Sequence, residues 1–161
     1  MRRRVSVELW RLAIAVLWIG MVGAIGFIEA PLKFQAPGIT IPLGLGIGRL
    51  VFMALNIAEG VLLIALVALS IWPASARLAR GRAAWLVGLA VVFLVKILVV
   101  RPPLNARTDL VLSGADPGQS PWHYVYIACD LGTLAILLVF AVLAARSVVR
   151  MATVPEVDPS R

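Results

Sequence analysis

Long apolar runs dominate the chain, separated by shorter segments that hold most of the Pro, Gly and charged residues. Each run reaches the ~17–25 residues that a helix needs to cross a hydrocarbon core about 30 Å thick. The pattern therefore predicts an all-α fold, an integral membrane four-helix bundle forming a single domain over residues 1–150. The predicted helices span about residues 9–29, 49–72, 84–101 and 122–146.

The segments between the runs carry turn residues. Gly44, Gly46 and Gly48 could suggest a phosphate-binding loop, but no strand precedes them and no Lys-Ser/Thr pair follows. They are better interpreted as a flexible approach to the second helix. We expect a polar loop over residues 104–121 and a disordered cytoplasmic tail over residues 151–161.

Basic residues are unevenly distributed between the two sides of this bundle. The N-terminal segment and the connector before the third helix hold seven Arg residues, with Glu8 as their one acid. Cytoplasmic loops carry such an excess, so we predict that both termini lie inside and that the protein is multi-pass in the cell (inner or plasma) membrane. A basic start before an apolar run also fits a cleaved signal peptide, but the run is long enough to span. The five Trp residues mostly lie near predicted helix ends, as in an aromatic belt.

Composition supports a lipid-embedded chain. Of 161 residues, 61% are hydrophobic and 14% are charged, and the mean hydropathy is +0.99. The net charge of +7 could attract nucleic acid, but most Arg residues sit at the ends of apolar runs, and no soluble basic domain remains to bind it. The lone Cys129 excludes an intrachain disulfide, and with one His it makes a poor zinc set, so we predict no metal site. The cofactor, if any, is unknown.

Ionisable residues nevertheless lie inside the apolar runs. Glu59, Lys96 and Asp130 fall in the second, third and fourth helices, and Glu29 ends the first. A charge at the centre of a spanning helix costs about 2.5–3.5 kcal/mol and usually faces the bundle interior. At ~1.5 Å per residue the first three lie about 15, 8 and 12 Å below the outer ends of their helices. The outer half should thus hold a charged layer, and the cytoplasmic half should be apolar.

Spacing adds further residues to this layer. Arg49, Asn56 and Glu59 share one helical stripe, as do His123, Tyr126 and Asp130. Glu29 and Lys33 are four apart, although Pro31 between them makes a regular helical pair doubtful. The predicted binding residues are Glu59, Asp130, Lys96, Asn56, Arg49, His123, Glu29 and Tyr126. The alternative is that these side chains only hold the bundle together.

Several short motifs are spread along the chain. They are Gly-Ala-Ile-Gly-Phe at 23–27, Ala-Pro-Leu-Lys-Phe at 30–34, Gly-Ile-Gly-Arg-Leu-Val-Phe at 46–52, Arg-Pro-Pro-Leu-Asn-Ala-Arg at 101–107, and His123. Together they resemble a poorly characterised four-helix membrane family that includes transmembrane protein 205. The resemblance implies a small membrane protein loosely tied to metal or drug tolerance.

Other motifs are similar to DoxX-like membrane subunits of quinone-linked oxidoreductases, namely Gly26-Phe27, Lys33-Phe34 and Glu-Gly-Val-Leu-Leu at 59–63. Three functions therefore stay open. The first, which we favour, is a non-enzymatic pocket in the outer half that binds or passes a small solute, ion or proton. The second is a membrane subunit of an oxidoreductase or other enzyme, and the third is a structural anchor. Besides the bilayer, we expect a homo-oligomer or a partner membrane subunit.

Overall fold

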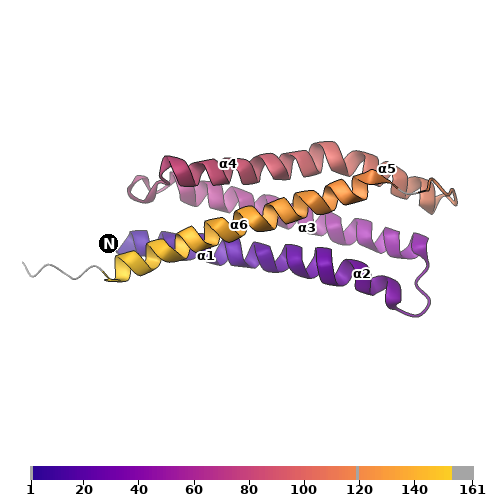
Figure 1. The fold of residues 1–161 in the computed structure, drawn as a ribbon, viewed down its shortest axis with the longest axis horizontal. Coiled ribbons are helices and arrows are strands. Elements are labelled where there is room, and N and C mark those ends of the chain that lie inside the picture. Colours follow the sequence, from indigo (N-terminus) through magenta and orange to yellow (C-terminus); the bar gives the residue numbers. More distant parts are fainter. Residues whose placement is uncertain (1, 119, 154–161) are drawn as a thin grey trace, which may run out of the picture.

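The computed structural model describes residues 2–118 and 120–153, and all regular elements in these ranges are helical. Four helical rods run alternately in opposite directions, so residues 2 and 153 lie at the same end of the bundle (Figure 1). We call this the terminal end, and it also holds the connector at 72–79. The opposite, distal end holds the connector at 36–40 and the described residues 113–118 and 120.

Two of the four rods are composite. The first consists of α1 (Arg2–Val22), the π-helix η1 (Gly23–Glu29), α2 (Ala30–Leu32) and the 3₁₀-helix η2 (Lys33–Gln35). The second is α3 (Ile41–Ile71), followed by the 3₁₀-helix η3 (Ala74–Ala76). The third consists of α4 (Arg80–Val95), the π-helix η4 (Lys96–Val100) and α5 (Arg101–Leu112). The fourth is α6 (Pro121–Thr153).

The second rod begins earlier than predicted. The Thr40 Oγ1 accepts a hydrogen bond from the Leu43 backbone N–H at 3.3 Å, and Pro42 occupies the first turn. An N-cap threonine followed by an early proline is a favourable helix start, because both satisfy or remove the unpaired N–H groups there. The interpretation of residues 44–48 as a flexible approach was therefore wrong, since they lie within α3.

The third rod continues through Pro102 and Pro103, where we had predicted that it would stop. Proline has no N–H, and its ring clashes with the carbonyl four residues earlier. The wider π turn of η4 precedes this pair, and η1 precedes Pro31 in the same way. The predicted loop at 104–121 is thus helical up to Leu112. The predicted tail is helical over 151–153, and its remainder lies outside the described residues.

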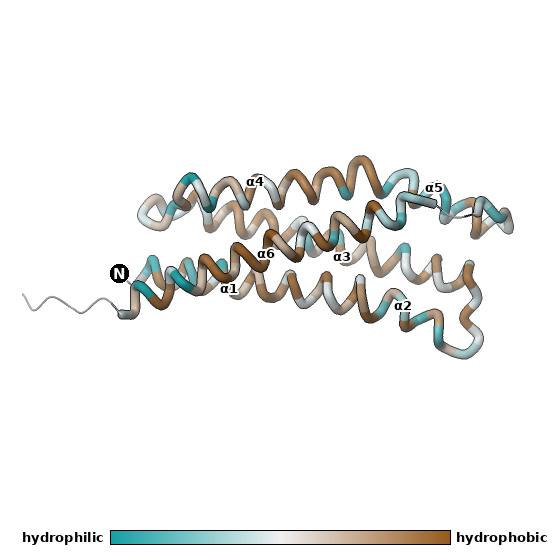
Figure 2. The backbone as a smooth tube through the Cα atoms, in the orientation of Figure 1, coloured by the Kyte–Doolittle hydropathy of each residue, from teal (hydrophilic) through white to brown (hydrophobic). Residues whose placement is uncertain are grey.

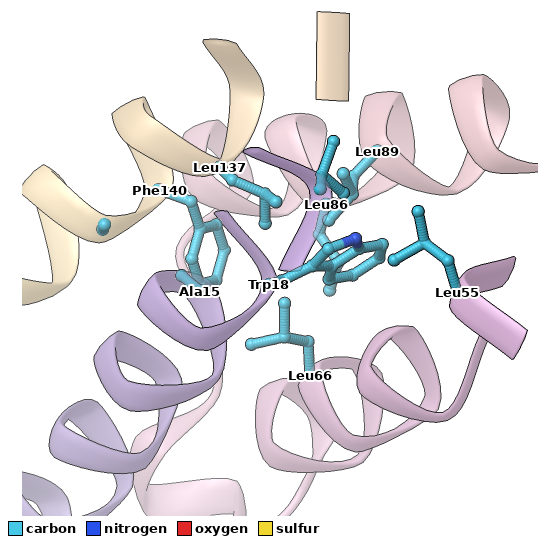
Figure 3. Close-up of a cluster of buried hydrophobic side chains, with 10 residues drawn as sticks. Ala15, Trp18, Leu55, Leu66, Leu86, Leu89, Leu137 and Phe140 are labelled. Carbon is cyan, nitrogen blue, oxygen red and sulfur yellow. The ribbon is translucent and has the colours of Figure 1, made fainter. Parts of the chain in front are cut away.

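All four rods contribute to one buried apolar core (Figure 3). Trp18 lies at its centre among Leu55 and Leu66 of α3, Leu89 of α4 and Leu137 of α6, and all five side chains are at most 1% exposed. Trp18 is therefore a core residue and not part of an aromatic belt, whereas Trp10 and Trp72 are exposed.

The outer surface of the rods is also apolar over most of their length (Figure 2). Large aliphatic side chains such as Ile57, Ile64, Leu98 and Leu138 are at least 60% exposed. An apolar surface of this extent is unfavourable in water and favourable in lipid. All four rods are long and apolar enough to span a bilayer. The all-α four-helix bundle is confirmed, and the chain is a multi-pass membrane protein.

Candidate functional site

The three charged residues predicted inside the helices meet at one point of the bundle. Lys96 Nζ donates hydrogen bonds to both carboxylate oxygens of Glu59, each at 2.7 Å, and to Asp130 Oδ1 at 2.8 Å. All three side chains are at most 3% exposed. The ammonium thus uses its three N–H donors on two carboxylates. We call this group the triad, and its formal charge is −1 because two acids surround one base.

The two carboxylates of the triad differ in their surroundings. Glu59 also accepts a hydrogen bond from Trp18 Nε1 at 3.0 Å, so both of its oxygens are engaged and enclosed by the core. Asp130 Oδ2 accepts no hydrogen bond from any described residue. It faces Gly26 of η1, where an added Cβ would lie 3.5 Å from it. Asp130 is therefore the member of the triad that can still accept a proton or a donor.

A cavity of about 470 Å³ extends from Asp130 toward the distal end, with walls from all four rods. Its volume lies in the ~300–1,000 Å³ range of small-molecule sites. Asp130, Asn56 and Gly26 are the lining residues nearest the middle of their rods, and we call them the floor of the cavity. Phe34, Gly44, Thr108 and His123 lie nearest the distal connectors, and we call this part of the lining the mouth.

Asn56 and Tyr126 form a second polar contact beside the triad. The Tyr126 hydroxyl donates to Asn56 Oδ1 at 2.9 Å, and the Lys96 Nζ lies 5.4 Å from the centroid of the Tyr126 ring. Asn56 is 4% exposed, yet its Nδ2 has no hydrogen-bond partner among the described residues. An unpaired buried donor is costly, so this amide is a group that a ligand could satisfy.

Lys33 reaches into the cavity from the first rod, and close approach to α3 makes this possible. A Cβ at Gly48 would lie 2.8 Å from Lys33 Nζ, and one at Gly44 would lie 2.3 Å from the Phe34 ring. These two glycines therefore make room for Lys33 and Phe34. Sequence reasoning identified both glycines but gave them the wrong role, and it did not place Lys33 in the site.

Of the remaining predicted residues, Arg49 and His123 line the cavity and Glu29 does not. Arg49 is exposed and pairs with Asp109 of α5, which the sequence analysis did not single out. His123 lines the mouth beside Tyr124. Glu29 does not line the cavity, but its Oε2 accepts a hydrogen bond from Lys33 Nζ at 3.3 Å. This pair forms despite Pro31 because the π turn of η1 ends at Glu29 and Pro31 occupies the first turn of α2.

A second buried charge cluster lies at the terminal end, where we had predicted only apolar packing. Glu8 accepts hydrogen bonds from Arg11 Nη1 at 2.6 Å and from Arg82 Nη1 and Nη2 at 2.9 and 2.7 Å. Arg11 Nη2 also donates to the carbonyls of Leu69 and Ala76, both at 2.6 Å. We call Glu8, Arg11 and Arg82 the clasp. The prediction of an apolar cytoplasmic half was wrong. It assumed that arginines near a helix start are solvated, as they usually are, whereas Arg11 is buried in this bundle.

The fold and the site define a class of protein, a four-pass membrane protein with a polar-floored cavity at one end. Comparisons with known protein families, with curated proteins and with solved structures give no match. The resemblance to the family of transmembrane protein 205 therefore stays a prediction. Any function has to be argued from the cavity itself.

Proposed function

We propose that the protein binds a small solute or ion in the distal cavity, and that Asp130 exchanges a proton as it does so. The observation that carries the proposal is the open carboxylate oxygen of Asp130 on the floor of a cavity of about 470 Å³. The other carboxylate of the triad, Glu59, is fully engaged by Lys96 and Trp18.

The charge of the triad supports this proposal. Two carboxylates and one ammonium leave one negative charge in the interior of a membrane protein, where an uncompensated charge is costly. A proton or a donor group of a ligand would neutralise it, and Asp130 Oδ2 is the place where either can arrive. A purely structural role would be served by a neutral pair, and Glu59 with Lys96 already forms one.

Orientation decides from which side the cavity is reached. The terminal end carries the excess of Arg residues, in the N-terminal segment and in the segment 77–82 that leads into α4. With this end in the cytoplasm, as the positive-inside rule favours, the cavity opens to the outer side of the cell membrane. Four rods are few for a transporter. We therefore still expect the assembled protein to be a homo-oligomer.

Filling the cavity tests the proposal. Ala30→Trp places a large ring at the cavity wall, whereas Ala135→Trp places the same ring on the exposed face of α6. Each variant is reconstituted in phosphatidylcholine nanodiscs, and binding of octanoate, octanol and octylammonium is measured by calorimetry. We expect at least one probe to bind the wild type and Ala135→Trp but not Ala30→Trp. If none of the probes distinguishes the wild type from Ala30→Trp, the cavity is not a binding site.

A further inference from the structure

We infer that the ligand of this cavity is a small amphipathic organic carboxylate, held through its anionic group between Lys33 and Arg101. This inference rests on the proposed function and specifies its substrate class. It follows from four features of the cavity: two cations that converge, an unpaired amide donor, an apolar lining, and an open carboxylate beneath them.

The two cations converge on one residue of α3 from opposite rods. Lys33 Nζ, from the first rod, lies 5.6 Å from the centroid of the Phe52 ring. Arg101 Nη1, from the third rod, lies 3.4 Å from the Phe52 carbonyl oxygen. Both residues line the cavity. Two positive groups from different rods thus lie near Phe52, one at its ring and one at its carbonyl.

Neither cation is well neutralised by the protein. Among the described residues, Lys33 donates one hydrogen bond, which is its 3.3 Å ion pair with Glu29, whose side chain is 33% exposed. Arg101 forms no ion pair with a described residue, and its bond to the Phe52 carbonyl is long. Arg49, in contrast, has Asp109 as a partner at the mouth. One cation with a single, partly exposed counterion and one without an ion pair among the described residues line the same largely apolar cavity, and both favour an anion within it.

Asn56 supplies a third donor at the same place. It lies four residues after Phe52, one helical turn toward the floor and on the same face of α3. Its Nδ2 is buried and unpaired, while its Oδ1 is held by the Tyr126 hydroxyl. The tyrosine therefore fixes the amide, and the free N–H₂ is left as a donor for an anionic oxygen.

The remaining lining indicates an apolar body on the ligand. Most other residues around the cavity are apolar, including Phe27, Phe34, Leu45, Leu104 and Ile127. An inorganic anion would leave this lining without a partner. An amphipathic molecule would satisfy the donors with its head and the apolar walls with its chain.

Asp130 imposes a condition on the binding of a carboxylate ligand. Its own carboxylate would repel an anion bound between it and the mouth of the cavity. The charged or titratable side chains facing or neighbouring this part of the bundle come from all four rods: Glu29, Lys33, Arg49, Glu59, Lys96, Arg101, Asp109, His123, Tyr126, Cys129 and Asp130. Among the carboxylates of this set, Asp130 combines a cavity-facing position with an oxygen that has no donor. We therefore expect one proton to bind at Asp130 Oδ2 when the carboxylate ligand binds, so that the pair adds no net charge.

The test compares three probes that share an apolar chain and differ in charge. Octanoate, octanol and octylammonium are titrated by calorimetry into the protein in phosphatidylcholine nanodiscs, with empty discs subtracted. We expect octanoate to bind about tenfold or more tightly than octanol, and octylammonium to bind least. Equal or tighter binding of octylammonium or octanol would overturn the carboxylate assignment while leaving the binding proposal intact. Failure of all three would overturn the proposed function itself.

Matched variants locate the effect. Lys33→Gln and Arg101→Gln should each lose about tenfold in octanoate affinity and leave octanol unchanged, whereas Lys33→Arg should retain octanoate binding. Arg150→Gln at the terminal end is the control for net charge. Octanoate affinity that is unaltered in both Gln variants would refute the role of these cations.

Proton uptake is read in the same titration by using buffers of different ionisation heat. The wild type should take up about one proton per octanoate, and Asp130→Asn should take up none. Asp116→Asn changes an exposed carboxylate that does not line the cavity and should behave as the wild type. Uptake that persists in Asp130→Asn or disappears in Asp116→Asn would exclude Asp130 as the proton acceptor.

Discussion

Two buried charge clusters, one at the terminal end of the bundle and one near the middle of the rods, combine the same kinds of charged groups with different results. The clasp places one carboxylate between two guanidinium groups and has a formal charge of +1. The triad places one ammonium between two carboxylates and has a charge of −1. Each cluster therefore keeps one unpaired unit of charge away from water, which is costly in either case.

The clasp compensates its excess within the protein. Arg11 directs Nη2 at the carbonyls of Leu69 and Ala76. Leu69 lies in the last turn of α3, where carbonyls lack helical partners and where the helix dipole favours a cation. Arg82 Nη1 also donates to the Ser147 hydroxyl at 3.3 Å, which ties α4 to α6. The clasp thus joins all four rods, and none of its residues lines the distal cavity.

The triad leaves its excess on an oxygen that faces a cavity. Buried charge alone does not indicate a functional site, because the clasp also holds charged side chains that are at most 17% exposed. The informative difference is whether the surplus charge is met by the protein's own backbone or is left open where a ligand or proton can reach it.

The largest expected difference between the two clusters comes from changing one carboxylate of each to an amide. Glu8→Gln removes the counterion of two buried guanidinium groups and should lower the free energy of unfolding by about 3–5 kcal/mol. Asp130→Asn removes the surplus charge of the triad and keeps the Glu59–Lys96 pair, so the change should stay within about 1 kcal/mol. Thermal unfolding in one mild detergent measures both. Equal losses in the two variants would mean that the clusters do not differ as described.

Making the triad apolar should have a smaller effect on stability and a complete effect on binding. The triple variant Glu59→Leu, Lys96→Met, Asp130→Leu should unfold within about 2 kcal/mol of the wild type, since well-packed apolar replacements of buried ion pairs are often neutral or stabilising. It should lose all probe binding in the calorimetric assay. Retained binding would show that the triad is not part of the site.

The same treatment of the clasp serves as the matched control. Glu8→Leu, Arg11→Met, Arg82→Met leaves the carbonyls of Leu69 and Ala76 without their donors. This variant should be less stable than the apolar triad variant, by about 1–3 kcal/mol per unpaired carbonyl that stays buried. If the two triple variants have the same free energy of unfolding, the backbone contacts of Arg11 do not contribute to stability.

The smallest expected effect concerns glycines at the two ends. Gly44→Ala places a methyl group where the Phe34 ring lies and should cost about 1–3 kcal/mol. Gly81 of α4, at the terminal end, has no atom within 4 Å of an added Cβ, so Gly81→Ala should stabilise by up to about 1 kcal/mol. Urea or thermal unfolding distinguishes the two. A neutral Gly44→Ala would argue against tight packing between η2 and α3 at the cavity mouth.

The sequence predicts the bundle well because a bilayer imposes a minimum length and an apolar surface on each helix. It also predicts the triad, since charges such as Glu59, Lys96 and Asp130 inside apolar runs have to face inward and find partners. The errors of prediction from the sequence lie at helix ends, because single contacts determine at which residue a helix begins or ends. The Thr40 cap extends α3, and π turns carry two rods past prolines.

The clasp and the cavity-lining Arg101 were missed for a different reason. Arg11 and Arg101 lie near the expected ends of apolar runs, where an arginine normally reaches the water or the headgroups. Their burial depends on which carbonyls and side chains other rods bring to that level. Pairings such as Arg11 with Leu69 or Arg101 with Phe52 depend on tertiary packing and cannot be derived from the periodicity of one helix.

The two π turns have a consequence for motion within the bundle. A π turn holds one residue more than an α turn, so shifting it by one position along the helix rotates the residues it passes by about 100° around the axis. The η4 turn begins at Lys96 and the η1 turn contains Gly26, which faces Asp130. If either turn moved along its helix, the residues of that rod beside the triad would rotate, while the apolar core around Trp18 would stay in place. The same widened turns that let two rods pass their prolines thus lie where a one-residue shift would change the surroundings of Asp130.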